Sequence, residues 1–306
     1  AKQNDNNTRF SFDMLGEGAR TDADAQKYLT AYASAIDNIG KSESSPERDE
    51  ATDVNSANGI SVKLSALHPR YYFAQYDLVM TELLPRIKQL CVQAAKYNIG
   101  LSIDAEVAYR LDISMDIFEI LAKDKDLDGW QGLGFVLQAY QKRAPDTAKW
   151  LIGLAREANR RLMVRLVKGA YWDAEIKHAQ ELGLASYPVF TRKANTDLCY
   201  QHCAGILLDA QDAIYPQFAT HNAYTATMIL NIAGDRQFEF QRLHGMGHIL
   251  YANLRKRFAD RQIPVRVYAP IGNHRDLLPY LVRRLLENGA NSSFVNRFLD
   301  SQTPVE

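Results

Sequence analysis

Eight short apolar segments, each followed by a longer segment of helical period, recur along the 306 residues of the chain. This alternation constrains the fold most, because neighbouring parallel strands need a crossover of a dozen or more residues, usually a helix. It predicts a single-domain α/β fold, the (βα)8 or TIM-like barrel, and leaves an open doubly wound sheet as the alternative. The predicted strands are Arg9–Leu15, Ile60–Leu67, Gly100–Glu106, Gly134–Tyr140, Leu162–Gly169, Tyr215–His221, Phe238–His244 and Pro264–Pro270.

Amphipathic helices are predicted in the segments that follow the strands, and the segment after the fifth strand carries two of them. The first begins with Thr21-Asp22-Ala23-Asp24, a capping-box start, and is expected to end at Gly40. Lys41–Gly59, rich in Ser, Asp, Glu and Asn, is interpreted as a flexible insertion in a barrel domain of residues 10–300, with tails at 1–9 and 301–306. The predicted helices are Asp22–Ile39, Ala74–Tyr97, Asp112–Asp124, Asp146–Arg161, Trp172–Gly183, Arg192–Gln211, Ala223–Asp235, Ile249–Asp260 and Asp276–Asn288.

Charge and composition exclude several classes of protein. The 36 basic and 36 acidic side chains give a net charge of +0, which disfavours a chain-wide nucleic-acid or membrane-surface role. Apolar residues make up 46%, enough for a large core. We find no membrane-spanning run and no signal peptide, and the three cysteines Cys91, Cys199 and Cys203 have no metal or redox spacing. A cytoplasmic chain is therefore expected, and its start at Ala1 without Met suggests a fragment.

Ionisable side chains occupy one of the two alternating rows in several predicted strands. Such groups cost several kcal/mol in a strand interior unless they are paired or hydrated. They fall towards the carboxyl ends, where barrel enzymes build their sites. Any single one fits a structural ion pair, such as Lys63 with Asp104, but the whole ring favours an enzyme site. That ring consists of Lys63, Asp104, Gln138, Arg165 and Tyr268.

Three polar segments at predicted strand ends and a helix start could hold a cofactor with a pyrophosphate. They are Lys168-Gly169-Ala170, Thr191-Arg192-Lys193 and Thr220-His221-Asn222, each of which alone also fits a solvated loop. Gly245-Met246-Gly247 lacks the rest of a dinucleotide fingerprint, and the glycines between His244 and His248 disfavour a helical metal pair. We therefore predict no metal site.

The last predicted helix carries Arg283, Arg284 and Glu287 on one face. These residues fit either an exposed face with an i,i+4 Arg–Glu pair or a clamp for a carboxylate, because guanidinium matches a carboxylate bidentately.

Taken together, these residues resemble the proline dehydrogenase domain of bacterial bifunctional proline utilization flavoproteins. The resemblance runs from about Phe10 to Arg297. It is carried by the segments Phe12–Glu17, Val62–Arg70, Ile103–Glu106, Gln138–Arg143, Arg165–Trp172, Gln217–Asn222, Leu243–Gly247 and Tyr280–Gly289.

The resemblance implies a barrel whose last helix covers the active site and which oxidises L-proline to Δ1-pyrroline-5-carboxylate by hydride transfer to non-covalent FAD. It implies that Lys63, Arg283 and Arg284 hold the carboxylate of proline or of carboxylate-bearing analogues. It further implies catalytic roles for Asp104 and Arg165, and a gating pair of Glu17 with Arg283. Asp104, Tyr171, Leu243 and Tyr268 would wall the ring site. The expected FAD-lining residues are Gln138, Arg165, Val167, Lys168, Gly169, Ala170, Trp172, Thr191, Arg192, Lys193, Thr220, His221, Asn222, Glu287 and Phe294.

The same resemblance implies partners. The parent protein would carry an aldehyde dehydrogenase domain, deliver electrons to membrane quinone and lie peripherally at the inner membrane face. Family members with a DNA-binding domain exist, but no nucleic acid is expected to bind within this fragment. Two other hypotheses stay open: a Schiff-base aldolase that uses Lys63 or Lys168, and a non-catalytic binding barrel.

Overall fold

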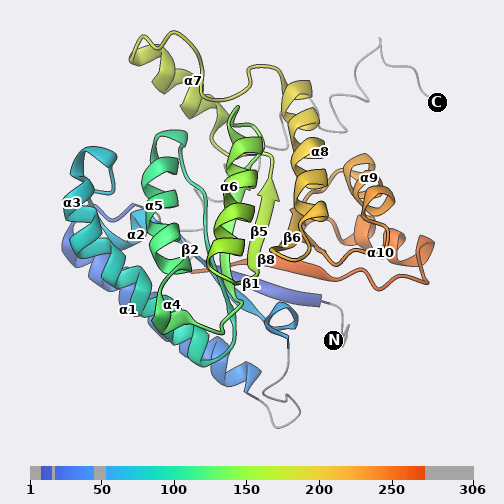
Figure 1. The fold of residues 1–306 in the computed structure, drawn as a ribbon, viewed down its shortest axis with the longest axis horizontal. Coiled ribbons are helices and arrows are strands. Elements are labelled where there is room, and N and C mark those ends of the chain that lie inside the picture. Colours follow the sequence, from blue (N-terminus) through green and yellow to red (C-terminus); the bar gives the residue numbers. More distant parts are fainter. Residues whose placement is uncertain (1–7, 16–17, 45–52, 273–306) are drawn as a thin grey trace.

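The computed structural model describes residues 8–15, 18–44 and 53–272. Within them eight parallel strands pair in chain order and close into a barrel, because β1 pairs with both β2 and β8. The predicted (βα)8 barrel is confirmed, and closure excludes the open sheet (Figure 1). The strands are β1 (Thr8–Met14), β2 (Gly59–Val62), β3 (Gly100–Ile103), β4 (Leu133–Gln138), β5 (Leu162–Val167), β6 (Ile214–Ala219), β7 (Glu239–Leu243) and β8 (Val265–Ile271).

Helices surround the barrel, and α7 lies at the end towards which β5 points (Figure 1). Leucine, isoleucine and valine side chains from the outward strand rows and the inward helix faces form one buried core between the two layers. None of the described helices combines the length and the hydropathy that crossing a membrane requires. The α-helices are α1 (Asp22–Glu43), α2 (Leu64–Leu67), α3 (Tyr76–Leu78), α4 (Leu84–Lys96), α5 (Leu111–Ala122), α6 (Ala144–Glu157), α7 (Trp172–Glu181), α8 (Lys193–Asp209), α9 (Ala223–Ala233) and α10 (His248–Arg257).

Helix α1 begins as predicted but ends later. Thr21 and Asp24 form the expected capping box, whereas the helix continues past Gly40 to Glu43. Gly40 serves packing rather than termination, because a Cβ added there would lie 2.2 Å from the ring of Tyr97. The first three residues of the predicted insertion 41–59 are therefore helical. Its end contains a short 3-10 turn at Val54–Ser56, and residues 45–52 lie outside the described part.

Two predicted elements are wrong in extent. The strand predicted to run to Leu67 ends at Val62, and the following residues turn into α2, with the Ala66 N–H donating to the Lys63 carbonyl. The helix predicted over residues 74–97 is interrupted by a π-helical turn at Val79–Leu83, immediately before Pro85. Proline has no N–H to donate to the preceding turn, and the regular α-helix α4 begins at Leu84 with Pro85 in its first turn. The predicted last helix, 276–288, lies outside the described residues.

Several strands end before the polar residues that were assigned to them. β5 stops at Val167 and β6 at Ala219, so Lys168–Ala170 and Thr220–Asn222 lie in loops. In a closed parallel barrel all such loops gather at the carboxyl ends of the strands. The fold therefore brings these segments to one end of the molecule.

Inward-facing charges form a second cluster at the opposite, amino end of the barrel. Glu239 accepts hydrogen bonds from Arg266 at 2.6 and 3.0 Å, and Arg266 also donates to the carbonyl oxygens of Ala57 and Asn55. Gln217 and Gln241 donate to Glu239 at 2.9 and 3.0 Å, and Arg9 and the Tyr215 hydroxyl approach it at 3.4 Å. This buried cluster fastens residues 55–57 across the amino end of the barrel and closes it.

Candidate active site

Inward-facing residues from β1, β5 and β8 and from the ends of β2 and β3 meet in one hydrogen-bonded cluster. Lys63 Nζ lies 2.5 Å from Asp13 Oδ1, 3.2 Å from Asp104 Oδ2 and 3.3 Å from the Tyr268 hydroxyl. The Tyr268 hydroxyl donates to Asp104 Oδ2 at 2.8 Å. The five residues Asp13, Lys63, Asp104, Arg165 and Tyr268 are called the inner cluster below.

Arg165 completes the inner cluster from β5. Its guanidinium donates to Asp104 Oδ1 at 2.7 Å and to the Ser61 hydroxyl at 2.7 Å. It also lies 5.1 Å from the centre of the Tyr268 ring, a cation–π distance. Asp104 thus holds both Lys63 and Arg165, so two cations are fixed side by side in a buried site. Such a site is suited to an anion.

The electrostatics of the inner cluster fix the charge of its main groups. Burial raises the pKa of Asp104, but the Lys63 ammonium and the Arg165 guanidinium outweigh it and hold that pKa below its usual value. Burial lowers the pKa of Lys63, yet the Tyr268 phenol and the two carboxylates raise it well above its usual range. At neutral pH, Asp104 is therefore a carboxylate and Lys63 an ammonium. The pKa of Asp13 is raised, mainly by burial.

A second group of cations follows β5 and begins α8. Lys168 and Lys193 both donate to the carboxylate of Asp197, at 2.5 and 2.9 Å. Burial and the neighbouring Lys193 lower the pKa of Lys168, although Asp197 opposes them. Arg192 adds an exposed guanidinium, and Thr191 is exposed beside it. The one carboxylate does not balance these cations, so this rim of the barrel favours a phosphate-bearing ligand.

The turn after β5 depends on Gly169. Its φ of +136° lies in a region that side chains rarely adopt, and a Cβ there would lie 2.4 Å from the Tyr140 ring. The Tyr140 N–H donates to the Lys168 carbonyl at 2.7 Å, and its hydroxyl donates to Glu175 at 3.3 Å. Glu175 also accepts the Ala108 N–H at 2.6 Å. The loops after β3, β4 and β5 are thereby tied together.

We predict that Gly169→Ala lowers the free energy of unfolding by about 1–3 kcal/mol, through backbone strain and overpacking against Tyr140. Urea unfolding measures the effect. Gly153→Ala is the matched control, because Gly153 lies in α6 with open space around it and should gain about 0.5–1 kcal/mol. Equal stability of Gly169→Ala and the wild-type chain would show that the turn tolerates a side chain.

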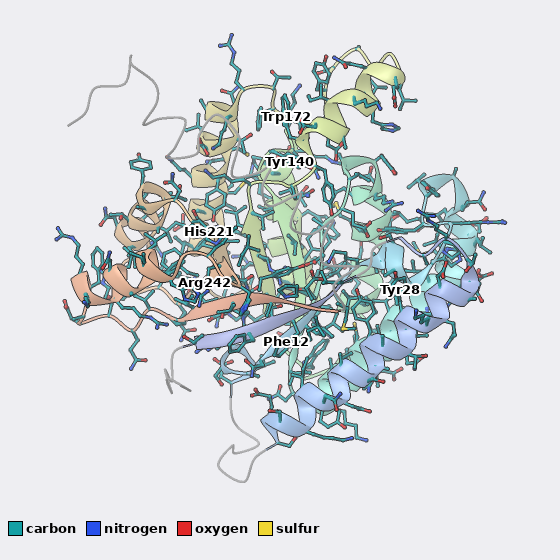
Figure 2. All side chains as sticks on the ribbon, turned by 180° about the vertical axis from the view of Figure 1, so that it is seen from behind. Phe12, Tyr28, Tyr140, Trp172, His221 and Arg242 are labelled. Carbon is teal, nitrogen blue, oxygen red and sulfur yellow. The ribbon has the colours of Figure 1, made fainter. Side chains whose placement is uncertain are left out.

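The other predicted cofactor residues lie at the same end of the barrel, some with structural partners. Asn222 Oδ1 accepts the Thr225 N–H at 2.9 Å and caps α9, and His221 Nε2 accepts the Leu243 N–H at 3.0 Å. Trp172 is 43% exposed and donates to the Phe190 carbonyl. Figure 2 shows Tyr140, Trp172 and His221 as labelled side chains, with the first two towards the end at which β5 stops.

The remaining predicted residues are placed as follows. Gln138 is buried at the end of β4, where its Oε1 accepts from Gln141 at 2.7 Å, so its side chain is bonded locally rather than to the inner cluster. Five of the predicted residues lie in the loops and strand ends at the carboxyl end of the barrel and are half-buried or buried: Val167, Ala170, Tyr171, Leu243 and Thr220. Those that lie outside the described residues are Glu17, Arg283, Arg284, Glu287 and Phe294.

Sequence reasoning missed Asp13, although within the described part of the chain its carboxylate lies nearest to the Lys63 ammonium. The signal was available in β1, where Arg9, Ser11 and Asp13 alternate with aromatic and apolar neighbours just as the polar rows of other strands do. Glu239 at the amino end was missed as well, because it follows Phe238 at the start of a predicted strand. A systematic comparison of both rows in every strand would have found both carboxylates.

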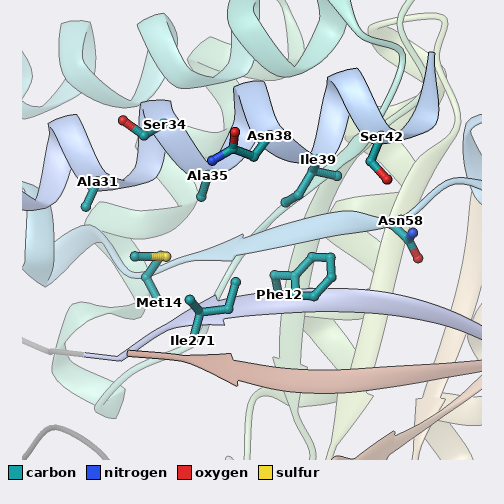
Figure 3. A pocket seen from close by; sticks show the side chains of 10 residues that line it. All are labelled: Phe12, Met14, Ala31, Ser34, Ala35, Asn38, Ile39, Ser42, Asn58 and Ile271. Atoms are coloured by element: carbon teal, nitrogen blue, oxygen red, sulfur yellow. The ribbon is translucent and has the colours of Figure 1, made fainter. Parts of the chain in front are cut away.

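An apolar cavity of about 400 Å³ lies away from the inner cluster, between α1 and the outer faces of β1 and β8 (Figure 3). Phe12 and Met14 line it and belong to the outward row of β1, opposite in parity to Asp13. This cavity is therefore separate from the charged site. Among the described residues no group of His, Cys, Asp or Glu is arranged to hold a metal ion, and the three cysteines are buried and free.

Comparisons with known proteins bear on the family and the fold of the chain. The family model described as "Proline dehydrogenase" matches residues 1–297. The bifunctional protein PutA of Salmonella typhimurium is 55% identical over 304 residues, covering 97% of this chain and 23% of that protein. The PutA of Escherichia coli is 54% identical with the same coverage. A crystal structure of proline utilization A from Bradyrhizobium japonicum is 54% identical with a TM-score of 0.89, covering 98% of this chain and 30% of that one. The chain thus spans about a quarter of the length of these curated relatives.

Proposed function

The chain belongs to the proline dehydrogenase family, and we propose that it oxidises L-proline to Δ1-pyrroline-5-carboxylate with non-covalent FAD as the first step of proline catabolism. The observation that carries the proposal is the inner cluster, in which Asp104 fixes Lys63 and Arg165 at the carboxyl end of a barrel of this family. Such a site can bind an amino acid by its carboxylate and orient its ring.

The substrate carboxylate would bind to Lys63, together with Arg283 and Arg284 from the last helix. An ammonium whose pKa is raised well above its usual range keeps its charge for this task. Asp104, Tyr268, Tyr171 and Leu243 would wall the ring and exclude water. Holding the reacting carbon in one orientation is the largest contribution that the protein makes to such a reaction. We further propose that Glu17 pairs with Arg283 when the site closes.

The residues at the rim fit FAD. Lys168, Arg192 and Lys193, with the start of α8, would hold its pyrophosphate, since this rim has more cations than carboxylates. Gly169 lets the turn after β5 pass close to the Tyr140 ring, and exposed Trp172 offers a ring for packing. When bound, FAD would supply the acceptor for the hydride from the ring carbon beside nitrogen. Arg165 would place its positive charge near the flavin ring and stabilise negative charge there.

The product and the electrons of this reaction must be passed on, and the proposal therefore extends to the parent protein. We propose that an aldehyde dehydrogenase domain outside this chain consumes the product, as the word "bifunctional" in the relatives' names supports. Membrane quinone would accept the electrons. The parent protein would then be cytoplasmic and dock peripherally at the inner membrane face.

The Schiff-base aldolase is the second candidate, and one observation bears on each of its lysines. Lys63 is held as an ammonium between two carboxylates, which disfavours it as a nucleophilic amine. Lys168 has a lowered pKa, which favours it, but its amine is occupied by Asp197. Borohydride trapping of a covalent adduct with a carbonyl substrate would identify an aldolase.

The proposed reaction is tested by mass spectrometry of the product and by deuterium substitution. Proline incubated with the FAD-loaded chain and an electron acceptor should lose two hydrogens. Deuterium on the ring carbon beside nitrogen should slow the reduction of the flavin, because that C–H bond breaks. Unchanged proline would contradict the proposed function, and a rate that does not respond to deuterium would contradict a rate-limiting hydride transfer from that carbon.

We predict that Arg284→Met weakens proline binding roughly ten- to a hundredfold and leaves FAD bound, because losing a charge-assisted hydrogen bond costs about 1.5–3 kcal/mol. Steady-state kinetics and FAD titration measure the two effects separately. Arg236→Met is a matched control, since Arg236 forms an exposed ion pair with Asp209 on the barrel surface. Wild-type kcat/KM for proline in Arg284→Met would remove Arg284 from the carboxylate clamp.

A further inference from the structure

Asp13 has no role in the function proposed above, yet among the described residues it makes the shortest hydrogen bond to Lys63. Its Oδ1 lies 2.5 Å from Lys63 Nζ, while the second carboxylate, Asp104, is 3.2 Å from the same nitrogen. Both carboxylates are at most 9% exposed. One ammonium therefore lies between two buried carboxylates, an arrangement that holds it in place from both sides.

The charges of the inner cluster balance one another. Lys63 and Arg165 supply two positive charges, and Asp13 and Asp104 can supply two negative ones. A substrate carboxylate that binds Lys63 competes with Asp13 and Asp104 for the same ammonium, and the charge of the ligand itself would be balanced by Arg283 and Arg284. A buried carboxylate that loses its cationic partner costs several kcal/mol, so binding is favoured if that carboxylate gains a proton at the same time.

Of the groups that face Lys63, Asp13 is the one suited to gain that proton. Asp104 receives hydrogen bonds from Arg165 and Tyr268 as well as from Lys63, which stabilise its charged form. Asp13 interacts with Lys63 and with the Tyr268 hydroxyl, whereas the Arg165 guanidinium donates to Asp104 and to the Ser61 hydroxyl instead. A substrate carboxylate would compete with Asp13 for the Lys63 ammonium.

The phenols that face the cluster do not take this role. Tyr268, from β8, has a pKa well above its usual value, chiefly through burial, and stays neutral. Tyr32, from α1, accepts the Lys63 backbone N–H, and burial raises its pKa as well. A phenol that stays protonated offers no site for a further proton.

We propose that Asp13 is the positioning residue of the substrate site: it holds the Lys63 ammonium at the mouth of the barrel and takes up a solvent proton when a substrate carboxylate binds. The proton returns to solvent when the ligand leaves, so no other reactant is needed. The raised pKa of Asp13 is consistent with this role. Burial and the neighbouring Asp104 raise that pKa, although Lys63 opposes the rise. This inference rests on the proposed function, since it assumes that the site binds a carboxylate.

The test measures protons taken up by the FAD-loaded full chain on binding cyclopentanecarboxylate, which carries the carboxylate but has no nitrogen to be oxidised. Calorimetric titration in two buffers of different ionisation enthalpy gives the uptake directly. We expect net uptake around neutral pH, vanishing at low pH where Asp13 is already protonated. The dissociation constant should rise by up to about tenfold per pH unit where uptake is greatest.

Variants separate this role from a purely structural one. Asp13→Asn should abolish the uptake and make binding nearly independent of pH, whereas Asp13→Glu should retain uptake with a shifted pH range. Asp37→Asn is the control, because Asp37 lies on α1 outside the barrel, where it accepts from Gln93 and Tyr97. If Asp13→Asn does not fold, the shift in the pH range of proton uptake by Asp13→Glu tests the role of Asp13 instead.

Binding without proton uptake in the wild-type chain would overturn the role of Asp13, and so would wild-type uptake in Asp13→Asn or an unshifted pH range in Asp13→Glu. Failure of the chain to bind any carboxylate is a different result, which contradicts the proposed substrate site itself.

Discussion

Asp104→Asn is expected to lower kcat/KM for proline by about a hundredfold, the loss typical of misplaced reacting groups. Asp104 is the acceptor that Lys63, Arg165 and Tyr268 share. A neutral amide cannot balance two cations. Its NH2 group is also a donor, and it would face donors whose hydrogen bonds the carboxylate accepts. Both cations should therefore move, although neither has been mutated.

Steady-state kinetics with proline measures this loss, and circular dichroism shows whether the barrel remains folded. Asp112→Asn is the matched control, because Asp112 forms an exposed ion pair with Arg143, and exposed pairs contribute about 0–1 kcal/mol. A folded Asp104→Asn with wild-type kcat/KM would mean that the inner cluster is structural and that the active site lies elsewhere.

Glu239→Gln is expected to destabilise the chain by about 3–5 kcal/mol, the usual result of removing one partner from a buried ion pair. Glu239 is 0% exposed, and its loss leaves the Arg266 guanidinium at the amino end of the barrel without its carboxylate. Urea unfolding measures the difference. Replacing both residues, as Glu239→Leu with Arg266→Met, should recover part of the loss, but Arg266 also holds the carbonyl oxygens of Asn55 and Ala57.

The same carboxylate predicts a pH dependence. Burial raises the pKa of Glu239, but Arg266 outweighs it and holds that pKa below its usual 4.5. A group with a depressed pKa stabilises the folded state above its unfolded pKa and loses that contribution as the pH falls. The wild-type free energy of unfolding should thus decline below about pH 4.5 more steeply than that of Glu239→Gln. Parallel acid curves would contradict this assignment.

The sequence was sufficient for the barrel because alternation of strands and helices is a local pattern. Two of its errors in the fold involve glycine and proline, and others are strands predicted to run past their ends, such as the one that stops at Val62. Gly40 was expected to end α1, yet it is there because Tyr97 packs against it. The π-helical turn before Pro85 likewise follows from a missing N–H that periodicity alone does not reveal.

The candidate site was predictable in part, because side-chain parity indicates which residues enter the barrel but not which ones meet. Lys63, Asp104, Arg165 and Tyr268 were expected to face inward, and the structure joins them through hydrogen bonds. Asp13 joins them because β1 pairs in parallel with β2, which brings its carboxylate to Lys63 although the two residues lie 50 positions apart in sequence. The roles of Arg283 and Arg284 remain predictions from the resemblance.

The absorption spectrum of the purified chain, loaded with FAD and mixed with proline in the absence of oxygen, tests whether the chain is a proline-oxidising flavoprotein. We predict a yellow protein whose flavin absorbance bleaches with proline and does not bleach with cyclopentanecarboxylate. A colourless chain that cannot take up FAD, or a yellow one that proline leaves unchanged, would contradict it.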